Sequence, residues 1–292
     1  MHVVITPAMV GQIVISGLLA GALYAMVALG LALVFGVMRV INVAHGTLLM
    51  LGAYTTFWWF HLLGLNPYLS LLASMPLMFA FGMLLQRLLV RRVVDAPELS
   101  SLLLTFGISI ALVNLTQLAF TSDLRSVEFL TGAFIVGPFA LSKSRLIAFA
   151  FAVGITLFAF WFLQKTKFGK AIRATSQSRE VAMVCGINAP RIHLYTFGIA
   201  SALAAAGGSL VAGIVAIQPE MGQVYTFKSF LVIVLGGAGN YPGALLGGML
   251  LGLVEQLASL FLTTQLSEAV AYVLLVLVLL LRPTGLLGGR AT

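Results

Sequence analysis

The chain has 292 residues, of which 61% are hydrophobic and only 8% are charged, and it carries a formal net charge of +8. Soluble domains are roughly 45–50% apolar and about 25% charged, so this composition excludes an ordinary soluble protein and indicates an integral membrane protein. The positive charge does not indicate a nucleic-acid-binding domain, because the basic residues lie at the ends of apolar segments, where they act as topology signals. The first six residues contain no basic region ahead of the long apolar run, so no cleaved signal peptide is predicted.

The membrane segments are predicted from apolar runs near the ~20 residues that a helix needs to cross a bilayer. Eight such runs cover residues 9–37, 47–63, 68–90, 100–120, 146–163, 194–217, 243–262 and 268–281. A further stretch, 227–235, is too short to cross alone and is expected to extend back toward Val224 as a half-helix or to run into the next segment. The sequence therefore predicts an all-α polytopic membrane protein of eight or nine segments, in which residues 1–292 form a single transmembrane domain.

The distribution of basic residues predicts the orientation of these segments. With nine segments and the polar loop 164–193 in the cytoplasm, the inside loops hold Arg39, Arg87, Arg91, Arg92, Lys165, Lys167, Lys170, Arg173, Arg179, Arg191, Arg282 and Arg290. The outside loops hold only Arg125, Lys143, Arg145 and Lys228. This bias follows the positive-inside rule and predicts an N-terminus outside and a C-terminus in the cytoplasm.

Two glycine-rich stretches interrupt the predicted helices. The run 9–37 would form a helix of roughly 43 Å, longer than the ~30 Å hydrocarbon core. Residues 36–46 then read G-V-M-R-V-I-N-V-A-H-G, and residues 235–248 read L-G-G-A-G-N-Y-P-G-A-L-L-G-G. The candidate positions in these breaks are Asn42, His45, Gly46, Gly236, Gly237, Asn240 and Pro242. One break in each half of the chain is typical of transporters with broken helices. Two tight cytoplasmic turns would explain the same pattern equally well.

Polar side chains within the apolar segments are further candidates for a translocation path. Glu255 is the only acidic residue deep within a predicted span, so it either faces a cavity, pairs with a neighbour, or lies near the outer end of its helix. Asn114 and Gln117 share one helix face and could bind another helix or line a path. For His45 and Arg39, a role in the path stands beside interfacial snorkelling with local hydrogen bonding.

The loop 164–193 is the one long polar segment in this apolar chain. Stretches 168–175 and 178–185 are predicted to be short helices, because Ser178 suits an N-cap, Glu180 the first turn and Gly186 the position after the last turn. The apolar residues of these helices, which could dock another surface, are Ala171, Ile172, Val181, Ala182, Val184 and Cys185. The segment is therefore interpreted as a docking site for a soluble partner, although a solvated loop that only sets topology would also be basic.

No pattern in the sequence predicts chemistry on this chain. The glycine cluster at Gly236 lacks the G-K-[ST] ending of a P-loop, so it offers no lysine for phosphates. Ser, His and Asp residues have no catalytic spacing, H-E-x-x-H is absent, and the single Cys185 excludes a multi-cysteine metal site. The chain is expected to have no catalytic residue and no metal, and not to be an enzyme.

Four blocks carry a resemblance to a known family. They are G-A-L-Y-A-M-V-A-L-G-L-A-L-V-F-G-V-M-R-V-I-N-V-A-H-G (21–46), T-K-F-G-K-A-I-R-A-T-S-Q-S-R-E-V-A-M-V-C-G-I (166–187), V-L-G-G-A-G-N-Y-P-G-A-L-L-G-G (234–248) and R-P-T-G-L-L-G (282–288). In this order the chain resembles the permease subunit of branched-chain amino-acid ABC importers, the shorter of the two permease types. The glycine block also recurs in sugar permeases of the wider superfamily. Val43 replaces a frequent aromatic residue and Cys185 a usual leucine.

The resemblance implies one half of an importer in the bacterial inner membrane. It implies a second related permease, two cytoplasmic ATPases that bind ATP and Mg²⁺, and an extracytoplasmic solute-binding protein, with no cofactor on this chain. In such importers a cytoplasmic permease helix sits in a groove of the ATPase. The matching residues here are Phe168, Gly169, Lys170, Ala171, Ile172, Arg173, Ala174, Thr175, Arg179, Glu180 and Gly186.

The resemblance leaves the substrate open. Similar permeases carry leucine, isoleucine and valine, whereas others carry different amino acids, amides or urea. A mostly apolar path with few charges suits a neutral or zwitterionic solute. A self-contained secondary transporter is the main competing class, but its ion relay would rest on Glu255 alone. A membrane scaffold without transport is also compatible with the composition.

Overall fold

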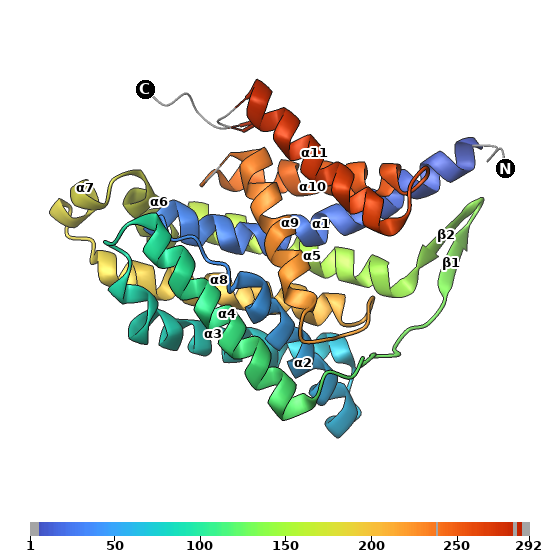
Figure 1. Cartoon of the computed structure of the whole chain (residues 1–292), viewed down its shortest axis with the longest axis horizontal. Coiled ribbons are helices and arrows are strands. Elements are labelled where there is room, and N and C mark those ends of the chain that lie inside the picture. Colours follow the sequence, from blue (N-terminus) through green and yellow to red (C-terminus); the bar gives the residue numbers. More distant parts are fainter. Residues whose placement is uncertain (1–5, 238, 283–284, 288–292) are drawn as a thin grey trace.

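The computed structural model describes residues 6–237, 239–282 and 285–287, and these form a bundle of helices (Figure 1). The α-helices are α1 (Pro7–Met38), α2 (His45–Leu63), α3 (Leu71–Leu88), α4 (Glu98–Phe120), α5 (Lys143–Lys165), α6 (Lys167–Gln177), α7 (Arg179–Val184), α8 (Ala189–Val211), α9 (Met221–Gly236), α10 (Tyr241–Ala258) and α11 (Thr264–Leu281). Two 3₁₀ turns, Pro67–Ser70 and Val90–Arg92, flank α3.

The all-α membrane fold that the sequence predicts is confirmed. Each predicted apolar stretch falls on one helix, with α6 and α7 between the fifth and sixth stretches. Within the described residues, five helices are long and apolar enough to cross a membrane: α1, α3 with its flanking turns, α4, α5 and α8. Counting the bent pair α9–α10 as one span gives up to six, and α11 contributes a shorter apolar helix. The predicted eight or nine segments are roughly consistent with this arrangement.

The centre of the bundle is formed by α1 and α8. In their most apolar windows 78% and 83% of residues are buried, against 28% for α4 and for α5, which therefore lie at the periphery. Small residues allow α1 to approach α10 closely: a Cβ on Gly21 would lie only 2.8 Å from the Cα of Met249. Association of helices in lipid depends on such van der Waals contact, so this pairing is a main attachment within the bundle.

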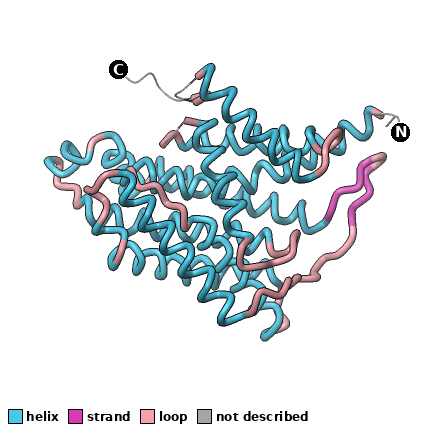
Figure 2. The backbone as a smooth tube through the Cα atoms, viewed as in Figure 1, coloured by secondary structure: helices cyan, strands magenta, loops and turns pink. Residues whose placement is uncertain are grey.

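The two ends of the bundle carry different elements. One end holds α6, α7 and the last turn of α1, and the other holds a β-hairpin and the first turns of α1 (Figures 1 and 2). The hairpin consists of β1 (Ala133–Val136) and antiparallel β2 (Phe139–Ser142), in a region predicted only to be a loop. The side chain of Gln12 binds the hairpin to α1, since it donates to the Ala140 carbonyl at 2.8 Å and accepts from its N–H at 3.0 Å.

The first predicted break, between α1 and α2, turns back into the bundle. Arg39 ends α1 in the left-handed region with φ 52°. His45 begins α2, and its Nε2 lies 2.9 Å from the carbonyl oxygen of Val27, eleven residues before the end of α1. At 1.5 Å per residue this is roughly 16 Å from that end, so α2 starts deep beside α1.

The backbone of this break is held by hydroxyl side chains of α4. The N–H of Ile41 donates to Ser101 Oγ at 3.2 Å, and the N–H of Val43 donates to Thr105 Oγ1 at 3.1 Å. Thr105 Oγ1 in turn donates to the carbonyl oxygen of Ile41 at 2.8 Å. Irregular backbone away from water must find such partners within the protein, and these bonds supply them; a broken helix at this position stays a prediction.

The second predicted break joins α9 to α10, whose axes are bent by 117°. Asn240 caps α10 by accepting from the N–H of Gly243 at 3.0 Å, and Pro242 occupies the first turn, where no N–H is needed. Gly239 lies beside Gly36 in the last turn of α1. This break lies near the end of α1, and its sharp bend between two apolar helices fits a broken span or a re-entrant loop. The predicted residues Ala238, Pro283, Thr284, Gly288 and Arg290 lie outside the described part of the chain.

Candidate coupling site and translocation path

Helix α6 is fixed against the end of α5. Thr166 caps it by accepting from the N–H of Gly169 at 2.9 Å. Gly169 is buried, and a Cβ there would overlap the backbone of Phe162 and Leu163, so only glycine permits this close approach. Ile172 is fully buried. The glycine and the isoleucine of the predicted coupling element thus hold the helix in place on its own chain.

Helix α7 is bounded by the caps that the sequence predicts. Ser178 Oγ accepts from the N–H of Val181 at 3.3 Å, and Glu180 lies in the first turn. Gly186 has φ 82°, its N–H donates to Met183, and the N–H of Ile187 donates to Ala182, both at 3.0 Å. This pair of bonds is the Schellman motif, which requires a residue that tolerates the left-handed region.

The apolar residues predicted to dock a partner divide into two groups. Ile172 and Ala182 pack inside this chain, so the interpretation that they are offered to a partner is wrong. Val181 and Val184 point outward, with 62% and 89% of their surface exposed. Basic residues that are exposed around them are Lys165, Lys167, Lys170, Arg173 and Arg191. The outer face of α6–α7 is therefore both apolar and positively charged.

Several of the basic residues predicted to face inside lie at this end of the bundle. A cavity of about 370 Å³ separates the end of α1 from α6 and α7, and Arg39 and Arg179 both line it. Arg179 also forms an ion pair with Asp95 in the connection between α3 and α4. That ion pair links α7 to the segment that follows Arg92. Arg39, the group Arg87, Arg91 and Arg92, and the loop 164–193 therefore lie at the same end of the bundle.

A second cavity of about 370 Å³ lies between α4 and α9. Asn114 lines it, together with Thr226 and Gln223 of α9. Gln117, on the same face of α4, donates from Nε2 to Glu220 Oε1 at 2.5 Å. Gln117 therefore binds a neighbouring segment, as one of the two interpretations predicts, and Asn114 lines a cavity. That this cavity belongs to a translocation path stays a prediction.

The residues of the first break are structural contacts of the core. His45 is fully buried, and Gly46 donates its N–H to Thr226 Oγ1 at 3.0 Å. A Cβ on Gly46 would overlap the carbonyl oxygen of Gly222, so this glycine allows α2 to meet α9. Asn42 is 1% exposed, and its Oδ1 has no partner among the described residues. His45 forms a hydrogen bond within the protein, to Val27 of α1, but it is buried, so interfacial snorkelling does not describe it.

Glu255 belongs to a buried charge cluster that sequence reasoning missed in part. Lys228 was expected in an outside loop, but it lies within α9 and is 8% exposed, so it gives no topology signal. Its Nζ lies 2.6 Å from Glu255 Oε1 and 3.3 Å from Glu268 Oε1, and it donates to the Tyr24 hydroxyl at 3.1 Å. The available signal was a lysine in an apolar stretch that must find a carboxylate if it is buried.

The fold and these sites define a multi-pass α-helical membrane protein of the transport permease class. A family model described as "Branched-chain amino acid transport system / permease component" matches residues 13–279, so the chain belongs to this family. It is a permease subunit of an ABC importer, and its family is a transport component rather than an enzyme. No solved structure shows a significant match to the chain.

Similar proteins cover nearly the whole chain. The high-affinity branched-chain amino acid transport system permease protein LivH of Escherichia coli (strain K12) is 32% identical over 296 residues, 95% of each chain. The corresponding protein BraD of Pseudomonas aeruginosa is 34% identical over 302 residues, again 95% of each chain. The ribose import permease protein RbsC of Haemophilus influenzae is 25% identical over 130 residues, 42% of this chain and 40% of that protein.

Proposed function

We propose that this chain forms half of the path by which a bacterial ABC importer carries branched-chain or other neutral amino acids across the inner membrane. The names of the relatives at 32% and 34% identity support this substrate class. Residues 1–292 act as one permease unit beside a second related permease and an extracytoplasmic binding protein. Two cytoplasmic ATPases bind ATP and Mg²⁺, and this chain binds neither. Urea, amides or another small polar solute form the alternative substrate class.

The outer face of α6–α7 is the observation that carries the proposal. Val184 has 89% of its surface exposed beside the exposed bases Lys170 and Arg173. An apolar side chain on a short, well-capped helix gains free energy only when another surface covers it. Loop 164–193 is therefore the coupling loop on which a cytoplasmic ATPase docks, and ATPase movement is transmitted through the buried contacts of Gly169 and Ile172.

The orientation follows from the basic residues at the α6–α7 end. Positive residues near the ends of membrane helices favour the cytoplasmic side. We place α6, α7 and the C-terminus in the cytoplasm, and the hairpin with the N-terminus outside. The cavity between α4 and α9, with Asn114 and Thr226 in its wall, is then the part of the path that this subunit offers.

The docking part of the proposal is tested with substitutions on exposed positions, because a change at Gly169 would disturb α6 itself. We expect V184D and the double variant K170E/R173E to lose most ATPase co-purification and ATP-dependent leucine uptake in proteoliposomes. The control is K143Q, a basic residue at the opposite end of the bundle, which should behave as the wild type. Unchanged co-purification and uptake in both coupling variants would show that the ATPase docks elsewhere.

The substrate part is tested on the complete importer with its binding protein. Leucine, isoleucine and valine should be taken up only with ATP, and they should compete with one another. Uptake of urea or acetamide with no uptake of leucine would favour the alternative substrate class. Leucine uptake that continues without ATP would favour a self-contained secondary transporter.

A further inference from the structure

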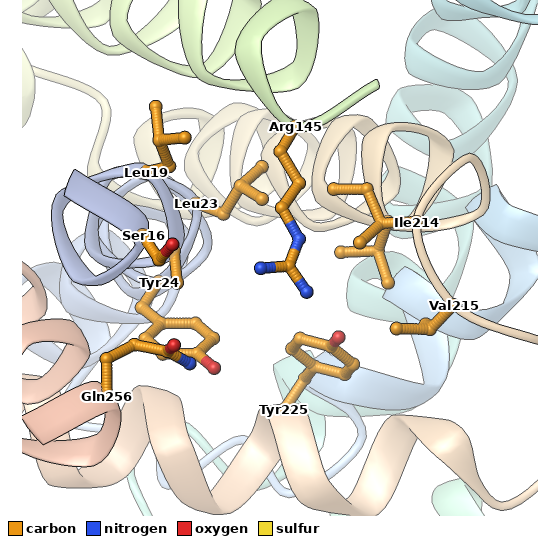
Figure 3. A pocket seen from close by; sticks show the side chains of 11 residues that line it. Ser16, Leu19, Leu23, Tyr24, Arg145, Ile214, Val215, Tyr225 and Gln256 are labelled. Atoms are coloured by element: carbon orange, nitrogen blue, oxygen red, sulfur yellow. The ribbon is translucent and has the colours of Figure 1, made fainter. Parts of the chain in front are cut away.

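A cavity of about 120 Å³ lies between α1, α5, the end of α8, the first turns of α9 and α10 (Figure 3). It is separate from the cavity between α4 and α9, since the two share no lining residue. Its volume is several times the ~30 Å³ of one water molecule but below the roughly 300–1,000 Å³ of pockets for drug-sized ligands. The cavity therefore suits a small organic molecule.

Four polar side chains with unused hydrogen-bonding groups face this cavity. They belong to Ser16, Arg145, Tyr225 and Gln256. Within the described part of the chain, the ion pairs are Arg179–Asp95, Lys228–Glu255 and Lys228–Glu268, so Arg145 has no carboxylate partner there. Tyr225 and Gln256 accept hydrogen bonds through their backbone carbonyls, which leaves their side-chain polar groups for the cavity. The guanidinium of Arg145 points from α5 into the space next to the rings of Tyr24 and Tyr225 (Figure 3). A guanidinium offers five donors in a planar fork that matches a carboxylate, so this end of the cavity suits a carboxylate group.

Negatively charged side chains lie next to Tyr24, close to the cavity. Tyr24 lines the cavity, and its hydroxyl accepts from Lys228, whose Nζ is held by the carboxylates of Glu255 and Glu268. This cluster contains two carboxylates and one ammonium group. Glu255 Oε2 is buried and has no partner among the described residues. Once a ligand carboxylate neutralises Arg145, this cluster keeps one negative charge in excess, which favours a positively charged ligand group near Tyr24 because charges in a low-dielectric interior act strongly over a few ångströms.

The remaining wall of the cavity is aliphatic. Leu19 and Leu23 come from α1, and Ile214 and Val215 follow the end of α8 (Figure 3). Burial of a ligand's aliphatic group against these side chains would stabilise the bound state by about 25 cal/mol per Å² of apolar surface removed from water. The three features together match a molecule with a carboxylate, an ammonium group and a short aliphatic side chain.

We infer that this cavity binds one neutral aliphatic amino acid as its zwitterion, within a single permease subunit. The carboxylate binds Arg145 and the Tyr225 hydroxyl, the ammonium group lies at Tyr24, and the side chain packs on the aliphatic wall. The choice of an amino acid rests on the proposed function. The inference adds a binding site for that substrate which does not need the solute-binding protein.

The inference is tested with the purified complex of permeases and ATPases in nanodiscs, without nucleotide and without the binding protein. Radiolabelled leucine should bind saturably. R145Q should weaken binding about tenfold or more, which is about 1.4 kcal/mol. Y225F should weaken it roughly two- to tenfold, as expected for one neutral hydrogen bond. 4-Methylpentanoate, which lacks the ammonium group of leucine, and leucinol, which lacks the carboxylate, should each compete poorly.

The matched control is K143Q, which removes a positive charge two residues from Arg145 on the same helix. The Lys143 ammonium lies 5.2 Å from the centre of the Phe134 ring and does not line the cavity. Leucine affinity should not change in K143Q, and the melting temperatures of all variants should stay near that of the wild type. If R145Q is less stable, the cavity-filling variant A20F provides a second way to remove binding.

Three outcomes would overturn the inference. The first is no saturable leucine binding by the wild type, and the second is equal leucine affinity in R145Q and the wild type. The third is a phospholipid found by native mass spectrometry in the wild type and lost in R145Q, which would assign the cavity to lipid. ATP-driven leucine uptake that persists in any of these cases leaves the proposed function intact. Binding without any uptake would instead retain the site and reject the function.

Discussion

Replacing Lys228 with methionine tests the buried charge cluster most directly. The side chains of Lys228 and Glu255 are each 10% exposed, and their charged atoms are 2.6 Å apart. Methionine fills a similar volume but leaves the Glu255 carboxylate buried without its cation. Removal of one partner from a buried ion pair costs about 3–5 kcal/mol, so we expect K228M to lower the free energy of unfolding by that amount.

The other members of the cluster give graded expectations. A double variant, K228M/E255M, removes both buried charges, and apolar replacement of a whole pair is often near neutral, so most of the lost stability should return. Glu268 lies farther from Lys228, at 3.3 Å, and its side chain is 37% exposed. E268Q should therefore cost at most about 1 kcal/mol, as expected for a solvent-screened pair.

Denaturant unfolding in mixed micelles, followed by tryptophan fluorescence, measures these differences. K143M is the matched control, because it removes an ammonium group that contacts only the Phe134 ring among charged or aromatic partners in the described residues. Equal stability of K228M and K143M would refute the reasoning. So would a double variant that is no more stable than K228M alone, because the loss would then come from packing and not from an unpaired charge.

Three further predictions concern packing, capping and orientation. G46A should lower the free energy of unfolding by about 1–3 kcal/mol or prevent folding, because the added methyl group meets the Gly222 carbonyl. G154A is the control: a Cβ there meets nothing within 4 Å, so the same unfolding assay should find it neutral or slightly stabilising. S178A should cost about 1 kcal/mol through the lost cap and should raise hydrogen exchange in α7, and unchanged exchange would show that the cap does not hold the helix. Cys185 is exposed and is the only cysteine, so a membrane-impermeant maleimide should label it from the cytoplasmic side, and labelling only in right-side-out vesicles would reverse the proposed orientation.

Features that depend on neighbouring residues in the chain could be predicted from the sequence. The caps at Ser178 and Gly186 use bonds that span only a few residues, so the residue types alone indicate them. The apolar stretches likewise locate the membrane helices, because the length of a span is set by the bilayer. The hydroxyl bonds around residues 41–43 could not be predicted, since Ser101 and Thr105 lie about sixty residues away.

The depth and partners of individual side chains could not be predicted. Lys228 lies near the start of the short stretch 227–235, which is mostly apolar and does not indicate how deeply the lysine is buried. Helix α9 begins at Met221 and places the lysine between α10 and α11. Ile172 and Val184 are equally apolar in sequence, yet one is fully buried and the other 89% exposed. Helices of six to eleven residues are too short for the spacing of apolar residues to show which face packs against the bundle.

The attachment of α4 has a mechanical consequence. This helix has little buried surface, and its bonds to the rest of the chain include hydroxyl contacts from Ser101, Thr105 and Ser109, the last at 2.7 Å from Thr47. Each such bond contributes only about 0.5–1.5 kcal/mol and can re-form with water or with the helix's own carbonyls. Helix α4 could therefore tilt as a rigid body, exchanging a few hydrogen bonds, while the apolar core around α1 and α8 stays buried. Because α4 also forms one wall of the cavity that contains Asn114, a tilt of this helix would change the width of that cavity directly.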